Sequence, residues 1–128
     1  MSMSMSKDTV RDFSDLIAWQ KAHQLVLLTY QVVKHFPANE QFILVSQMTR
    51  AAISISSNIA EGFGRNTAKD KRQFYVIAKG SALELRSQIR IAKDIGYIDE
   101  ELFRQFERDA IEVVRLISGI INSAQTRE

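Results

Sequence analysis

Two polar residues in the middle of the sequence, Asn58 and Glu61, are the strongest candidates for chemistry. Asn58 follows Ile55 by three residues on the apolar side of a predicted helix, where a buried amide needs hydrogen-bond partners. Glu61 falls in the last turn, where the helix dipole disfavours an acid, so we expect a compensating donor at Arg65 or Ser81. The two are either a polar cluster that fixes helix register, which we favour, or a carboxamide–carboxylate pair for binding or catalysis.

Metal and thiol chemistry find little support in the sequence. The absence of cysteine excludes disulfides, thiolate metal sites and cysteine nucleophiles, and it is compatible with a reducing cytosol. The histidines, His23 and His35, lack the Glu-x-x-His spacing of a di-iron bundle and argue against a structural zinc site. We therefore expect no metal and no cofactor, and we expect His23 to pack or hydrogen-bond within the fold.

The glycines at 62 and 64 and the serines at 54, 56 and 57 also lack the partners that catalysis needs. Gly62-Phe63-Gly64-Arg65 has no Gly-Lys-Ser/Thr and follows no strand, so it indicates a helix end and a tight link, not a phosphate-binding loop. No histidine lies near the serines in sequence to act as a base. The sequence therefore predicts that the protein is not an enzyme.

The elements that hold these residues are predicted to be four long helices. One proline and five glycines among 128 residues leave few turn positions, which disfavours an all-β fold. Apolar residues recur every three or four positions over 15–35, 40–61, 68–95 and 100–123. We predict an all-α, antiparallel up-down-up-down four-helix bundle in residues 13–124, with a flexible N-terminal tail (1–12) and a C-terminal tail (125–128). A helical hairpin packed into a larger oligomer is a weaker alternative.

Caps and apolar stripes follow from the same pattern. The expected N-caps are Ser14 or Asp15, Asn39, Asn66 or Thr67, and Asp99, and the expected stops are Gly62, Gly64 and Gly96. The first helix is expected to bury the stripe of Leu16, Trp19, His23, Val26, Tyr30 and Val33. The fourth is expected to bury Phe103, Phe106, Ala110, Val113, Ile117 and Ile120.

Charge is distributed unevenly along the chain. Residues 65–93 hold eight Lys/Arg and two acids, whereas residues 94–112 hold seven acids and two Arg, a contrast that the net charge of +2 conceals. On the predicted third helix the cations share an arc of about 120°: Arg65, Lys69, Arg72, Lys79, Arg86, Arg90 and Lys93. Arg65 belongs to this arc if the first helical turn starts before residue 68. This stripe either tracks a nucleic-acid backbone or is a solvated face paired with acids of the fourth helix. Val76 and Leu83 interrupt it, which predicts burial in a subunit contact.

Membrane association is not expected. No run of about 18 apolar residues is present, so we predict no transmembrane helix. The first eight residues lack the apolar core and cleavage pattern of a signal peptide. These two expectations, together with the cysteine count, predict a cytoplasmic protein.

Several of these residues form a pattern that resembles a known family. Its components are Leu16-x-x-Trp19-x-x-Ala22, Phe36-Pro37-x-x-Glu40, Ser54-Ile55-x-x-Asn58-Ile59-Ala60-Glu61-Gly62-x-Gly64-Arg65 and Ala78-x-Gly80-Ser81-x-x-Glu84-Leu85. The pattern spans about residues 13–100 and is similar to the 23S rRNA intervening-sequence four-helix-bundle proteins. That family includes the accessory variability protein of diversity-generating retroelements.

The resemblance implies an antiparallel four-helix bundle that assembles as a homopentamer with a basic surface. It also implies nucleic-acid binding in some members and partnership with a reverse transcriptase in the retroelement members, but no catalytic residues. The motif residues for which we expect a structural role are Asn58, Glu61, Gly62, Gly64, Gly80, Ser81 and Glu84. The expected function is non-catalytic binding of RNA or DNA by a homo-oligomer, and the alternative is a scaffold that recruits a protein partner such as a reverse transcriptase.

Overall fold

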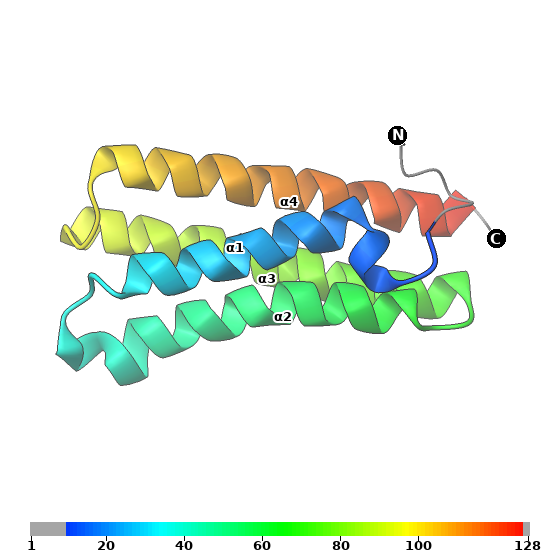
Figure 1. Ribbon diagram of the computed structural model, residues 1–128, viewed down its shortest axis with the longest axis horizontal. Helices are drawn as coiled ribbons and strands as arrows, with labels where there is room; N and C mark the ends of the chain where they lie inside the picture. The colour runs from blue at the N-terminus through cyan, green and yellow to red at the C-terminus, as the bar shows by residue number, and fades with distance from the viewer. Residues whose placement is uncertain (1–9, 127–128) are drawn as a thin grey trace.

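Four helices run side by side along the length of the molecule in the computed structural model, which describes residues 10–126 (Figure 1). They are α1 (Ile17–Val33), α2 (Ser46–Phe63), α3 (Ala68–Ile95) and α4 (Glu100–Thr126). Short links at alternating ends make neighbouring helices antiparallel, and α1 contacts both α2 and α4, which closes the bundle. The predicted all-α four-helix bundle is therefore confirmed. The parts of the expected tails at 1–9 and 127–128 lie outside the described residues.

The predicted ends of the third helix coincide with those of α3. The Thr67 hydroxyl accepts a hydrogen bond from the Asp70 backbone N–H at 3.1 Å, which caps the first turn. Gly96 ends the helix with a φ of 99°, a left-handed conformation that glycine adopts without a Cβ penalty. Asp99 then caps α4 by accepting from the Leu102 N–H at 2.8 Å. These predicted signals are all confirmed.

The predicted cap of the first helix is wrong. A 3-10 turn, η2 (Phe13–Asp15), precedes α1, and the Asp12 carboxylate accepts from the Ser14 N–H within that turn. The Asp15 carboxylate accepts from the Asp12 N–H at 3.0 Å and is likewise used there. Helix α1 begins after Leu16 with no side-chain cap, because Ser14 and Asp15 already take part in the turn η2.

The start of α2 also differs from the prediction. A 3-10 turn, η3 (Ala38–Glu40), and a π-helical turn, η4 (Gln41–Val45), lie between Pro37 and α2. The Glu40 carboxylate, not Asn39, caps η4 by accepting from the Leu44 N–H at 3.4 Å. The other Glu40 oxygen accepts from the Tyr97 hydroxyl at 2.6 Å, so this residue also joins the two links at one end of the bundle.

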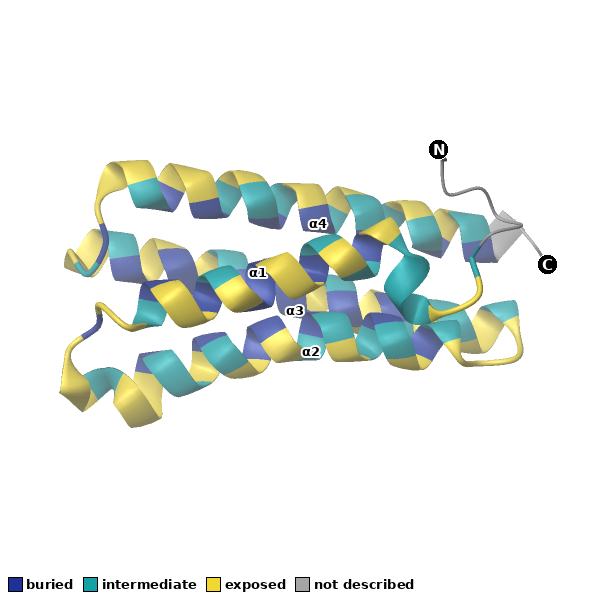
Figure 2. Ribbon diagram, viewed as in Figure 1, coloured by how far each residue is buried: buried dark blue, intermediate teal, exposed yellow. Residues whose placement is uncertain are grey.

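Buried apolar residues from all four helices form one core cluster, and Figure 2 shows the buried positions in dark blue along the helices. The stripe of α4 is as predicted from Phe103 to Ile117, and Ile120 is half-buried. The stripe of α1 is rotated by about one residue from the prediction, with Tyr30 and His23 exposed. Its buried residues are Ala18, Ala22, Leu25, Val26, Thr29 and Val32.

The rotation of α1 has a packing cause. The small side chains of Ala18 and Ala22 occupy the buried face of α1, whereas the larger Trp19 is only partly buried at the edge of the core. The His23 ring stacks on the Trp19 indole at 4.8 Å between centroids, so His23 packs on the outside of the bundle, not within it.

In the part of the chain that the structure describes, no helix is long and apolar enough to cross a membrane.

Candidate nucleic-acid interface

A polar cluster joins α2 to α3 at mid-length. The Ser54 and Ser81 hydroxyls lie 2.8 Å apart and share a hydrogen bond across the helix–helix contact. Asn58 donates from Nδ2 to the Ser54 carbonyl at 2.8 Å and to its hydroxyl at 3.1 Å. Because Ser81 is buried, this hydrogen bond disfavours sliding of α3 along α2. The arrangement supports a structural role for these motif residues.

Glu61 lies outside this cluster. Its carboxylate pairs with the Arg65 guanidinium at 2.9 Å, and both side chains are about half exposed. Arg65 was one of the two donors expected, whereas Ser81 pairs with Ser54 instead. No hydrogen bond joins Asn58 to Glu61 within residues 10–126, so the geometry gives no support to a carboxamide–carboxylate pair.

The glycines and Glu84 of the motif do not form one cluster. Gly62 is buried against the Tyr75 ring, and the Gly64 N–H donates to the Ala60 carbonyl at 3.3 Å to end α2. Gly80 is exposed on α3 with no atom near the position of a Cβ. Glu84 accepts from Gln88 Nε2 at 3.2 Å. We did not predict Gln88, a buried amide on α3, although its place four residues after Glu84 was visible in the sequence.

The basic stripe divides into two halves. In the half nearer the α3–α4 link, Arg86 bonds both oxygens of Glu107, from Nε at 3.0 Å and from a terminal nitrogen at 2.9 Å. Arg90 shares the same carboxylate at 3.0 Å, and Lys93 lies 3.6 Å from Glu100. Acids of α4 therefore offset the charge of this half, as the solvated-face interpretation predicts.

Replacing Glu107 with glutamine is expected to lower the free energy of unfolding by about 1–2 kcal/mol near neutral pH. The Arg86 hydrogen bonds, assisted by Arg90, hold the pKa of Glu107 below its ordinary value of 4.5. A lowered folded-state pKa stabilises the protein above the ordinary value, and this stabilisation is lost as the pH falls through the folded-state pKa. In urea unfolding, the difference in the free energy of unfolding between wild type and Glu107→Gln should therefore shrink below pH 4.5.

The matched control for this change is Glu112→Gln, an exposed acid on the same helix without an ion pair among the described residues. It should change the free energy of unfolding little at any pH. A Glu107→Gln effect that persists unchanged in acid would contradict the assignment of the stabilisation to the carboxylate.

In the other half of the stripe, Lys69, Arg72 and Lys79 form no ion pair with any residue from 10 to 126. Lys69 is exposed, and Arg72 and Lys79 are half-buried. The Arg72 Nε is buried and has no hydrogen-bond partner. Cations without an ion pair therefore lie on the first half of α3, from Lys69 to Lys79, whereas Arg86, Arg90 and Lys93 pair with acids of α4. Six of the seven predicted cations lie on α3, and Arg65 lies in the link before it. The six on the helix do not share one electrostatic environment.

An apolar strip lies on the outer face of α3. Val76 and Leu83 are 51% and 45% exposed, which leaves them accessible for the predicted subunit contact. Ile91 is also 45% exposed, and exposed Gly80 lies between the first two. Several large apolar side chains exposed on one helix face are typical of interaction surfaces.

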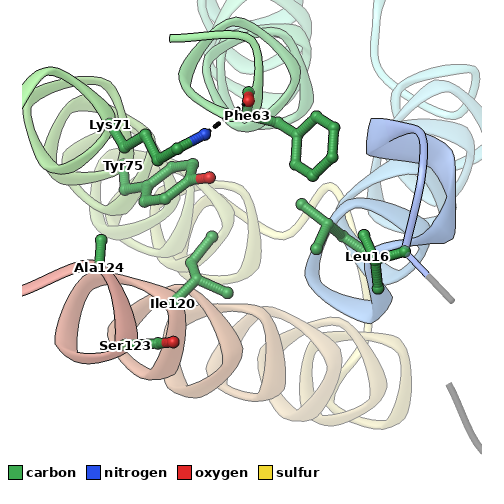
Figure 3. Close-up of a pocket in the computed structure, with 8 residues that line it drawn as sticks. Leu16, Phe63, Lys71, Tyr75, Ile120, Ser123 and Ala124 are labelled. Atoms are coloured by element: carbon green, nitrogen blue, oxygen red, sulfur yellow. Dashed lines mark hydrogen bonds between the residues drawn. The ribbon is translucent and has the colours of Figure 1, made fainter. Parts of the chain in front are cut away.

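The end of the bundle at the α2–α3 link also holds a cavity of about 370 Å³, partly open to solvent (Figure 3). Leu16, Phe63, Tyr75 and Ile120 supply apolar walls, and Lys71 supplies an ammonium group. Across residues 10–126 there is no group of three or more His, Asp or Glu side chains that could hold a metal ion.

Comparisons with known proteins agree with this architecture. The family model described as 23S rRNA-intervening sequence protein matches residues 14–119. A solved structure, of a protein with unknown function from the S23 ribosomal protein family from Bacteroides thetaiotaomicron VPI-5482, is 24% identical with a TM-score of 0.76. The match covers 82% of this chain and 98% of that chain and shows a shared fold. No curated protein matches the chain.

Proposed function

Because the chain belongs to the 23S rRNA-intervening sequence protein family, we propose that it is a non-catalytic, RNA-binding four-helix bundle that works as a homo-oligomer. The observation that carries the proposal is the group of cations without ion-pair partners, Lys69, Arg72 and Lys79, along the first half of α3. These cations can neutralise phosphates and release counterions without reading bases. RNA is proposed over DNA because the family description names 23S rRNA.

The proposal is tested by the salt dependence of binding. Fluorescence polarisation with a labelled RNA should show binding that weakens roughly 20- to 50-fold between about 50 and about 200 mM salt, if three or four phosphates are contacted. RNAs of unrelated sequence should bind with similar affinity. Absence of binding at the lower salt concentration would refute the proposal. Tighter binding to DNA than to RNA would contradict the choice of RNA as the ligand.

The homo-oligomer is proposed to be a pentamer that uses the outer face of α3. The support is the apolar strip of Val76 and Leu83, which the single chain leaves about half exposed. Burying such side chains against another copy removes apolar area from water and stabilises the assembly. Five chains of 14.6 kDa would have a mass of roughly 73 kDa.

Replacing both Val76 and Leu83 with lysine is expected to dissociate the pentamer. Ten added charges per pentamer would have to be buried without partners, whereas in the isolated chain the same side chains stay in water. Light scattering should report a shift from roughly 73 kDa to about the 14.6 kDa of one chain, with an unchanged circular dichroism spectrum.

The matched control is Leu27→Lys on α1, a position that is 53% exposed but lies away from α3. It should leave the mass unchanged. A wild-type protein that is monomeric at micromolar concentration, or a Val76→Lys/Leu83→Lys variant that remains pentameric, would contradict the proposed interface.

A second candidate function is a scaffold or adaptor that recruits a protein partner such as a reverse transcriptase. The observation that favours it is the π-helical turn η4, where Phe42 is 90% and Ile43 is 64% exposed, far from the basic half of α3. Phe42→Ser should then abolish copurification of that enzyme without changing RNA affinity. A neighbouring reverse transcriptase gene would favour this candidate.

A further inference from the structure

Gly80, in the middle of α3, makes no contact within the described chain that requires a glycine. It is exposed on the outer face of the helix, and no described atom lies within 4 Å of an added Cβ. Glycine inside a helix is less stable than alanine, so this position weakens α3 without serving the packing of the bundle itself. A glycine at such a place lets a side chain or backbone from outside approach the helix closely.

Large and small side chains alternate along this face of α3. Val76 and Leu83 precede and follow Gly80 by four and three residues and are 51% and 45% exposed, and exposed Ser87 continues the row. The spacing of four, three and four residues keeps these side chains on one side of the helix. Gly80 is therefore the low point between two exposed apolar side chains, an arrangement that accepts a side chain of another helix.

The order of the helices around the bundle limits which face of a second copy can meet this one. Helix α3 packs between α2 and α4, and α1 lies diagonally opposite (Figure 1). In such a bundle the outer faces of neighbouring helices point about 90° apart, and those of diagonal helices about 180° apart. A closed ring of five uses two different faces of each copy, which point about 108° apart because successive copies are turned by about 72°. The second face is therefore that of α2 or α4, not that of α1.

Between these two helices, α2 has the face that fits. Ile53 is 42% exposed on its outer side, and exposed Arg50 and Ser57 lie three residues before and four residues after it. One large apolar side chain between polar neighbours is the shape that the low point on α3 can receive. Helix α4 has no exposed large apolar side chain from Glu100 to Ala124.

The charges beside the two faces are complementary. Arg50, about one turn before Ile53, has no ion pair among residues 10–126. Glu84, next to Leu83, is also exposed and without an ion pair in that range, and it accepts a hydrogen bond from Gln88 Nε2 at 3.2 Å. Opposite charges at the border of a contact favour the matching face over others.

We propose that Ile53 on α2 of one copy packs over Gly80 on α3 of the next copy, between Val76 and Leu83. This inference rests on the proposed homo-oligomer and adds the surface of the neighbour that the apolar strip meets. The contact is head to tail, because each copy offers its α3 face to one neighbour and its α2 face to the other. Five such contacts close the ring, and the outer face of α1, which includes Leu27, takes no part in them.

Gly80→Leu tests the centre of the contact. Leucine fills the space that Ile53 would occupy and favours a helix over glycine, so the assembly should dissociate while the circular dichroism spectrum stays unchanged. Light scattering should report a fall from roughly 73 kDa to about the 14.6 kDa of one chain. The matched control is Gly119→Leu on α4, where a Cβ also meets nothing within 4 Å, and it should leave the mass unchanged.

Cross-linking identifies the pair of faces, because the chain has no cysteine of its own. A variant with both Ile53→Cys and Leu83→Cys, treated with a short bis-maleimide, should give a ladder of up to about five linked chains on a denaturing gel. Each substitution alone should give single chains, because equivalent residues of neighbouring copies lie far apart in a head-to-tail ring. The matched control combines Leu27→Cys with Leu83→Cys and should also give single chains.

Three results would overturn the head-to-tail contact while leaving a homo-oligomer in place. They are a missing ladder in the double variant, dimers linked by Leu83→Cys alone, and an unchanged mass of the Gly80→Leu variant. A wild-type protein with the mass of one chain would instead refute the proposed homo-oligomer, and RNA binding is measured separately by polarisation.

Discussion

Replacing Lys69 and Lys79 together with glutamate is expected to weaken RNA binding by about 100-fold at low salt. The two lysines have no ion-pair partners among the described residues, so their charge can meet phosphates at the edge of the proposed subunit contact. Because Lys79 lies between Val76 and Leu83 on α3, light scattering must show that the double variant keeps the mass of the wild type. Reversal removes two favourable contacts and adds repulsion at the same places. Arg72 is left unchanged because its partly buried side chain contributes to packing. Polarisation measurements over a range of salt concentrations provide both the affinity and its salt slope.

The matched control reverses two cations elsewhere with the same change in net charge. Arg104 and Arg108 are exposed on α4, outside the basic half of α3. Arg104→Glu with Arg108→Glu should weaken binding only modestly, through the overall charge. If both double variants lose affinity equally, binding depends on net charge, and no surface on α3 can be assigned.

Gly62→Ala is expected to destabilise the bundle by about 1–3 kcal/mol. A Cβ at this position would lie 2.7 Å from Cε1 of Tyr75 and 3.0 Å from Cβ of Phe74. Tyr75 is only 4% exposed, so its ring cannot move aside without disturbing the core. The glycine thus permits the close contact between the end of α2 and the start of α3. Urea unfolding monitored by circular dichroism measures the change.

Gly119→Ala is the control for this effect. Gly119 lies within α4 and has nothing within 4 Å of an added Cβ. Alanine should therefore stabilise the helix there by up to about 1 kcal/mol through its higher helix propensity. The two substitutions are chemically identical, but they are predicted to change the free energy of unfolding in opposite directions. Equal effects would show that propensity, not the contact with Tyr75, governs position 62.

Helix ends were predictable where a single residue determines them. Thr67 and Gly96 bound α3 as expected, because a capping hydroxyl and a left-handed glycine act on the backbone beside them. Asn39 failed as a cap because Pro37 is followed by a 3-10 turn and a π turn, and their register depends on how Glu40 meets Tyr97. That contact joins residues 57 positions apart and leaves no local pattern.

For the same reason, local sequence patterns did not predict which face of α1 is buried. They also did not predict which half of the basic stripe pairs with acids. Helix α1 has apolar residues on several sides, such as Leu27 and Tyr30, so its periodicity alone did not identify the buried side. The stripe of α3 was visible in the sequence, but its neutralisation depends on Glu107 lying opposite Arg86 and Arg90 in the packed helix pair. Such alignment is a property of the bundle.

The unequal charge of the two ends gives the molecule an orientation in an external field. Asp94, Asp99 and Glu101 are exposed around the α3–α4 link, whereas the unpaired Lys69 is exposed in the first turn of α3, where Asp70 is the one exposed acid. A polyanion that is not yet in contact would turn the lysine-bearing end of the bundle toward itself. Dissolved salt would shorten the distance over which this effect acts. In the proposed binding of RNA, more encounters would then begin with this end of the bundle facing the RNA.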